Sequence, residues 1–145
     1  MSSVAAVAAE GTKPMPQPSD SFDRTIAPEP ARVAEIRHAV ADQMQEWDLA
    51  PRLVENVLLV LSELVTNAVV HGEGSVHVTM RRVYPGLHIE VTDESTTAPL
   101  LAPVPLDVDD VHGRGLHLVD AFCDLWGIKD DGKTTWARFY AAGRS

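Results

Sequence analysis

The sequence is poor in several features that would mark specialised classes of protein. Its single cysteine, Cys123, excludes a disulfide framework and a zinc site built from several cysteines. Lys and Arg number 12 against 21 Asp and Glu, and this net charge of −9 argues against binding nucleic acid by neutralising phosphates. No uninterrupted apolar run reaches the ~18 residues that span a bilayer. Residues 1–11 also carry no Lys or Arg, so they make a poor signal peptide. We therefore expect a cytoplasmic protein that contacts neither nucleic acid nor membrane directly.

What remains is the composition of one ordinary globular domain. The 145 residues are 45% apolar, 23% charged and 6% aromatic, which is enough apolar material for a buried core. Residues 1–20 are rich in Ala, Ser, Gly and Pro, with Pro14, Pro16 and Pro18 in alternation, and show no helical or strand period. They predict a disordered tail, and residues 21–145 predict a single domain.

Two long helices follow from the spacing of apolar residues. Over 31–47 these residues recur every three or four positions, as in an amphipathic surface helix. A second helix is expected over 51–71, because Pro51 favours the first helical position and Gly72 ends the pattern. Apolar side chains cover nearly every face of this second helix, which predicts a position in the interior.

Alternation of apolar and polar residues marks the strands. The expected strands cover 22–26, 75–81, 87–92, 125–129 and 134–140. The turn Tyr84-Pro85-Gly86 joins the second and third, and Asp131-Gly132 joins the last two. A long aperiodic loop over 94–112 and a short helix ending near Phe122 lie between these hairpins. The order predicts an α+β fold, a two-layer sandwich whose mixed, mostly antiparallel sheet carries helices on one face.

Three polar residues on the second helix are out of place in an apolar segment. Glu63, Asn67 and His71 are four residues apart, so they share one side of the helix. Polar groups inside an apolar helix are costly unless something satisfies them. Either they bond to neighbouring backbone or water and specify the core, or they face a cleft and hold a ligand. Oxygen atoms from Glu and Asn suit Mg²⁺, which keeps water and is shared with phosphates.

Two further positions have both a structural and a functional interpretation. Asp93 ends an alternating strand, where it either starts a turn or accepts a hydrogen bond from a ligand. Gly113-Arg114-Gly115-Leu116 opens a helix, either as a plain junction or as a place where backbone N–H groups approach phosphate. The glycines do not complete the dinucleotide fingerprint, and Gly132-Lys133-Thr134 precedes a strand rather than the helix of a P-loop. The six histidines form no evident metal cluster.

Taken in order, these segments resemble the histidine-kinase-like ATPase family, also called the GHKL or Bergerat family. The resemblance covers about 22–140 and is closest to bacterial anti-sigma-factor serine/threonine kinases and their actinobacterial regulatory relatives. The matching segments are Glu63–Gly72 (N box), Val91–Ser95 (G1 box), Gly113–Val119 (G2 box) and Gly132–Ala137 (closing strand). Ser95 stands where the G1 box of the family usually has glycine.

The resemblance implies a Bergerat ATP-binding fold with an ATP–Mg²⁺ site between the sheet and the long loop. By analogy, Asn67 coordinates Mg²⁺ and Asp93 accepts a hydrogen bond from the adenine amino group. Gly113 and Gly115 let the loop and the helix N-terminus wrap the phosphates, and Thr134 assists at the adenine. The same boxes imply nucleotide contacts from His71, Ser95, Arg114 and Leu116.

The resemblance also implies an activity and its partners. Glu63 acts as the general base that draws a proton from a serine or threonine hydroxyl of a protein substrate. The implied protein binds a sigma factor, phosphorylates an antagonist with a STAS-type fold, and forms a homodimer. The alternative is a protein-interaction module of the same fold with little or no transfer activity. Glu63 and Asn67 favour the kinase, whereas the missing glycine at Ser95 favours the module. A sensor histidine kinase is not expected, because no dimerisation helix fits before residue 21.

Overall fold

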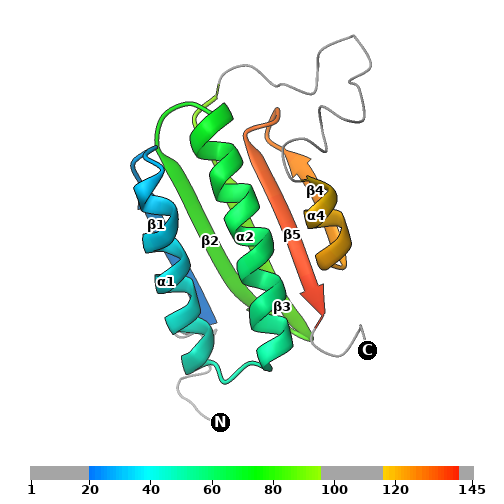
Figure 1. Cartoon of the computed structure of the whole chain (residues 1–145). Helices are drawn as coiled ribbons and strands as arrows, with labels where there is room; N and C mark the ends of the chain where they lie inside the picture. Colours follow the sequence, from blue (N-terminus) through cyan, green and yellow to red (C-terminus); the bar gives the residue numbers. More distant parts are fainter. Residues whose placement is uncertain (1–19, 96–115, 141–145) are drawn as a thin grey trace, which may run out of the picture.

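The computed structural model describes residues 20–95 and 116–140, which form one α+β unit (Figure 1). Its elements, in chain order, are β1 (Ser21–Ile26), α1 (Ala31–Glu46), α2 (Pro51–His71), β2 (Val76–Val83), β3 (Gly86–Thr92), α4 (Leu116–Phe122), β4 (Leu125–Lys129) and β5 (Thr134–Tyr140). Every expected helix and strand is confirmed, with ends that move by one or two residues. The expected loop over 94–112 lies outside the described residues except for Glu94 and Ser95.

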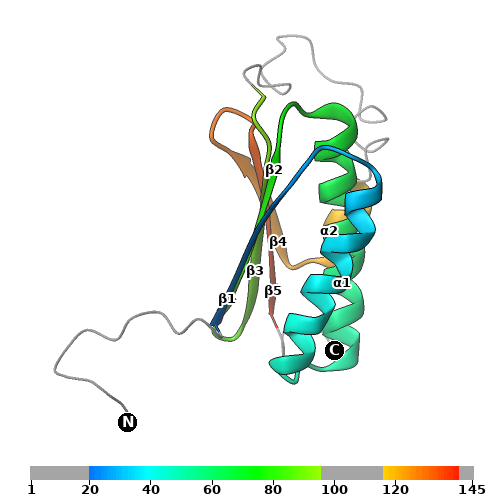
Figure 2. The ribbon, with the colours of Figure 1, turned by 90° about the vertical axis from the view of Figure 1, so that its left-hand side faces the viewer.

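The five strands form one sheet in the order β1-β2-β3-β5-β4. All neighbouring strands pair antiparallel, so the sheet of the described strands is not mixed as expected. Short turns join β2 to β3 and β4 to β5, and a chain that reverses within a few residues can pair only antiparallel. β1 lies at one edge of the sheet and β4 at the other. The helices cover one face of the sheet, which Figure 2 shows edge-on.

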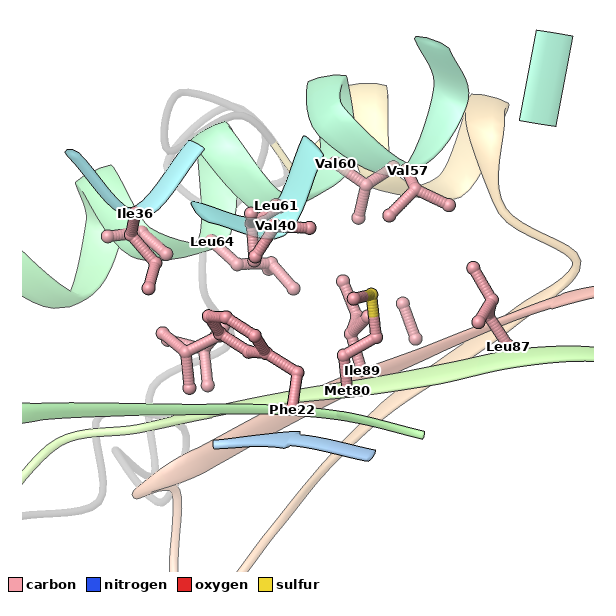
Figure 3. Close-up of a cluster of buried hydrophobic side chains, with 14 of the residues drawn as sticks. Phe22, Ile36, Val40, Val57, Val60, Leu61, Leu64, Met80, Leu87 and Ile89 are labelled. Carbon is pink, nitrogen blue, oxygen red and sulfur yellow. The ribbon is translucent and has the colours of Figure 1, made fainter. Parts of the chain in front are cut away.

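The core lies between the sheet and the two long helices (Figure 3). α1 contributes Ile36 and Val40, and α2 contributes a row that includes Val57, Leu61 and Leu64. On the sheet side, the core contains the fully buried side chains of Met80, Leu87 and Ile89 and the buried side chain of Phe22 from β1. Each such side chain contributes roughly 1.5–3 kcal/mol by its removal from water. This packing fixes α2 against the middle of the sheet.

The prediction that α2 lies in the interior holds for one side of the helix only. Its buried residues form one side of the helix, whereas Thr66, Val70 and His71 are exposed, and Val70 retains 59% of its accessible surface. The apolar residues on its other sides are only half-buried, because the sheet can cover one side of a helix and α1 and α4 cover only part of the rest. Among the described residues α2 is also long and apolar enough to span a membrane, with a mean hydropathy of 1.7, although a buried core helix meets the same criterion.

The tail prediction for residues 1–20 needs a correction of one residue. Asp20 belongs to the folded part, where Arg82 of β2 donates from Nη2 to its Oδ1 at 2.8 Å. Residues 1–19 lie outside the described residues, so the rest of that prediction is untested.

Candidate functional site

The predicted polar side of α2 lies near the boundary of the core rather than within it. Glu63 and Asn67 are half-buried and His71 is exposed, while the row Leu64, Val65 and Ala68 faces the core. The desolvation cost that this side would carry in an apolar interior is therefore reduced. Glu63 and Asn67 lie one helical turn apart on a helix held rigidly by its opposite side.

The chain is held firmly as it leaves β3. The N–H of Asp93 donates to the carbonyl of Lys133 at 3.0 Å, and the N–H of Glu94 donates to the carbonyl of Glu73 at 2.7 Å. The N–H of Ser95 donates to Oδ1 of Asp93 at 2.7 Å. This short segment is thus tied to the β4–β5 turn on one side and to the chain after α2 on the other. As a result the half-buried carboxylate of Asp93 has a defined position.

Gly72 allows that carboxylate to lie against the C-terminal end of α2. A Cβ built on Gly72 would come closer to Oδ2 of Asp93 than real Cβ atoms come to any neighbour, and would lie 2.5 Å from the carbonyl oxygen of Ala68. The φ of Gly72 is −89°, so the position requires space rather than an unusual backbone. Asp93 therefore lies beside a residue roughly 7.5 Å along the helix axis from Asn67. The structure thus places Asp93 beside Gly72, the last residue of the predicted N box.

Ser95 fits its position without strain. In the described part of the chain the non-glycine residues with positive φ are Asp48, Asp130 and Asp131. Ser95 is not among them, so its backbone is one that any residue adopts. Ser95 contributes only its main-chain N–H to the bond with Oδ1 of Asp93, so a serine makes this bond as well as a glycine does.

Strand register separates two threonines that the sequence alone did not distinguish. Thr134 is 1% exposed, and its hydroxyl lies 2.8 Å from that of Thr92, opposite it on β3. Thr135 lies opposite Val91, a core residue, and therefore points to the helix-covered face. Asp93 follows Val91 by two residues, so strand alternation places it on the face of Thr135. The role predicted for Thr134 is untested, and Thr135 is a candidate that only register could reveal.

The remaining predicted residues are described in part or not at all. Gly113, Arg114 and Gly115 lie outside the described residues, and Leu116 is the first residue of α4. Within 20–95 and 116–140 no group of three or more His, Cys, Asp or Glu could hold a metal. A Mg²⁺ ion that is shared with phosphates needs few protein ligands, because it keeps water in its remaining positions. Asn67, half-buried on α2, carries an amide oxygen of the kind that such an ion accepts as a ligand.

A second polar cluster occupies the opposite face of the sheet. The guanidinium of Arg138 donates to Nδ1 of His88 at 3.1 Å, and Nε2 of His88 lies 2.8 Å from a carboxylate oxygen of Glu90. Nζ of Lys129 also donates to Glu90 at 2.9 Å, and the ring of Trp136 stacks on His88. Burial by itself would raise the pKa of Glu90, but the bonds and charges of Lys129 and His88 outweigh it and hold this pKa below its ordinary value. The cluster stabilises the sheet and lies away from Asp93.

Fold and site together define a two-layer α+β domain with a polar cluster where its central helix meets the end of the sheet. The family model described as histidine kinase-like ATPase domain matches residues 26–139, and the chain belongs to this family. It is also 35% identical over 86 residues to an uncharacterized protein of Streptomyces coelicolor, an alignment that covers 57% of this chain and 82% of the relative. The expected family is confirmed, and membership supports ATP binding.

Proposed function

We propose that this protein is an ATP-binding regulator of the anti-sigma type. It transfers a phosphoryl group from ATP to a serine or threonine of a STAS-type antagonist protein and thereby controls a sigma factor. Family membership supports the ATP-binding part of this proposal. The kinase activity, Mg²⁺ and both protein partners rest on the resemblance of the residues between Glu63 and Thr134 to the anti-sigma kinases.

One observation carries the proposal. The carboxylate of Asp93 lies against Gly72, at the end of the same helix that carries Glu63 and Asn67. A hydrogen-bond acceptor, an amide oxygen and a second carboxylate therefore share one region of the domain. This is the set needed to bind an adenine ring, a phosphate-bound cation and an acceptor hydroxyl.

Each residue then has a chemical task. Asp93 accepts a hydrogen bond from the exocyclic amino group of adenine, and its backbone attachment to the β4–β5 turn, with that of Glu94 to the chain after α2, gives that bond its direction. The Asn67 side chain would hold Mg²⁺, which supplies charge neutralisation at the phosphates when bound. Thr135 extends the polar surface of the same face. The glycines 113 and 115 would bring backbone N–H groups to the phosphates.

In this proposal Glu63 is the general base. As the acceptor oxygen bonds to the γ-phosphorus and the bond to the β–γ bridging oxygen breaks, the Glu63 carboxylate takes the hydroxyl proton. Its place one helical turn before Asn67 keeps base and metal ligand on one rigid element. In phosphoryl transfer the protein mainly positions groups and stabilises charge, so this rigidity is the main contribution of α2.

The alternative function is an interaction module of the same fold that transfers no phosphate. The absence of glycine at Ser95 favours it, because glycine would let the backbone pass closer to a base. The ordinary backbone of Ser95 and its bond to Asp93 favour an intact site. Nucleotide binding and phosphoryl transfer decide between the two functions.

The test is a thermal melt with and without Mg-ATP, followed by a transfer assay with γ-labelled ATP and a STAS-type antagonist. A ligand at about 100 times its Kd adds about 2.7 kcal/mol, a rise of roughly 5–10 °C for a domain of this size. Wild type and Glu63→Ala are expected to show the rise, and Asn67→Ala to lose most of it. Only wild type is expected to transfer phosphate.

The matched control is Thr66→Ala, which changes an exposed residue of the same helix and is expected to behave as wild type. No rise at millimolar Mg-ATP in wild type would refute nucleotide binding and leave the interaction module. Full transfer by Glu63→Ala would refute the assignment of the general base.

A further inference from the structure

A small apolar groove lies at the opposite end of the molecule from Asp93. It has a volume of about 290 Å³ and is lined by Leu49 and Leu53 and by residues 82–86 of the β2–β3 turn. Figure 1 shows the α1–α2 connection and the β2–β3 turn at the same end of the sheet. Leu53 precedes Asn67 by fourteen residues, or roughly 21 Å of helix. The groove is therefore separate from the candidate nucleotide site.

An aromatic side chain at this groove is exposed to solvent. Tyr84 is 98% exposed, although it is one of the chain's two tyrosines and large aromatic side chains normally bury much of their surface. Beside it lie Pro85 and the two leucines, so the lining is mostly apolar. Aromatic-lined apolar grooves of this kind bind proline-rich segments, which arrive already extended and lose little conformational entropy.

The chain enters the fold at the rim of this groove. Arg82, a lining residue, donates from Nε and Nη2 to Oδ1 of Asp20 at 3.2 and 2.8 Å. The same guanidinium lies 5.3 Å from the centre of the Trp47 ring, so its position is fixed from both sides. Asp20 is the first described residue. The nineteen residues that precede it therefore join the fold at the residue that Arg82 binds.

The residues just before Asp20 are rich in proline, as a ligand for such a groove would be. Pro14-Met15-Pro16-Gln17-Pro18 places three prolines and one long apolar side chain two to six residues before Asp20. In a polyproline II conformation six residues span about 19 Å, which is ample to cross a groove at whose edge the segment is anchored. Met adapts well to irregular apolar surfaces.

We propose that the segment 14–18 docks in the groove of its own chain, with Met15 and the prolines against Tyr84, Leu49 and Leu53. Because Asp20 is anchored on Arg82, the segment is present at an effective concentration on the order of millimolar. A contact that would be weak between separate molecules is therefore occupied within one chain. The docked segment covers Tyr84 and Pro85.

The four methionines make this testable in the full-length protein. Met44 and Met80 are fully buried, Met1 starts the chain, and Met15 lies in the proposed segment. In a sample labelled with ¹³C at the methionine methyl groups, the Met15 signal is expected to lie away from that of Met1 and to show an NOE to the Tyr84 ring. In Tyr84→Ala it is expected to move to the Met1 position, while the Met44 and Met80 signals stay in place and report an intact core.

Tyr84→Phe is the matched control, because it keeps the ring and is expected to keep the Met15 shift and NOE. The proposal is overturned if Met15 resonates with Met1 in wild type and Tyr84→Ala leaves it unmoved. It is also overturned if the NOE disappears on tenfold dilution, or appears only between differently labelled chains, since the occupant would then be the segment of a second copy.

Discussion

Replacing Gly72 with alanine tests the placement of Asp93 most directly. The added Cβ would lie 2.5 Å from the carbonyl oxygen of Ala68 and 2.7 Å from Cγ of Asp93, both below the 3.0 Å limit of real Cβ contacts. The Asp93 side chain can turn away, but the Ala68 carbonyl belongs to the backbone of α2 and accepts the N–H of residue 72. The variant must therefore displace the carboxylate and distort the helix end.

The expected cost has two separable parts. Overpacking of this kind destabilises by about 1–3 kcal/mol. Each kcal/mol lowers the Tm of a domain of this size by about 2–4 °C, so the Gly72→Ala variant should melt about 2–12 °C below wild type. If Asp93 binds adenine, loss of one hydrogen bond to a charged group, worth about 1.5–3 kcal/mol, weakens Mg-ATP binding about 10- to 150-fold.

The assay is a thermal melt for the first part and titration calorimetry with Mg-ATP for the second. Gly74→Ala is the matched control, since a φ of +71° strains alanine there and the added Cβ meets the Glu94 side chain, whereas Asp93 is not among the atoms nearest to it. This control should lose stability and keep its affinity for Mg-ATP. If Gly72→Ala melts within 1 °C of wild type and binds Mg-ATP equally well, Asp93 does not depend on Gly72 and the reasoning fails.

Two further predictions follow from strand register and from the outer face of the sheet. Thr135→Val is expected to weaken Mg-ATP binding with little loss of stability. Thr134→Val should instead lower stability by about 1 kcal/mol through the lost bond to Thr92 and leave binding unchanged, and the opposite pattern would reassign the two threonines. Because the folded pKa of Glu90 lies below its ordinary value of 4.5, its ionisation stabilises the fold above that pH and ceases to do so as the pH falls through the folded pKa. Glu90→Gln should therefore be about 1–2 kcal/mol less stable than wild type at pH 7, with the gap closing as the pH falls below 4.5 in denaturant titrations, and a pH-independent gap would contradict this.

The local pattern of residues determined most of the secondary structure. Helix and strand periods differ, so apolar spacing located α2 at Pro51–His71 and β5 at Thr134–Tyr140 with the bounds that the structure shows. Turn chemistry located both hairpins, and their short turns made those two strand pairs antiparallel. The four-residue spacing of Glu63 and Asn67 likewise places them on one side of a helix in any fold.

The tertiary structure decided which of these patterns meet. The apolar composition of α2 predicted burial on nearly every side. The sheet covers only one side of this helix, so the residues on its other sides remain partly exposed. The contact of Asp93 with Gly72 joins residues twenty-one positions apart and depends on how β3 lies beside the end of α2.

The register between β3 and β5 determined which of Thr134 and Thr135 faces the helices, and the sequence of one strand alone does not specify that register. Residues 20 and 82 lie far apart along the chain, and only the pairing of β1 with β2 brings Asp20 to Arg82 at the groove. Sequence alone therefore determined the elements and the chemistry each one carries, because those depend on near neighbours. The structure decided which faces are covered and which groups meet, because packing acts between residues that are distant in the chain.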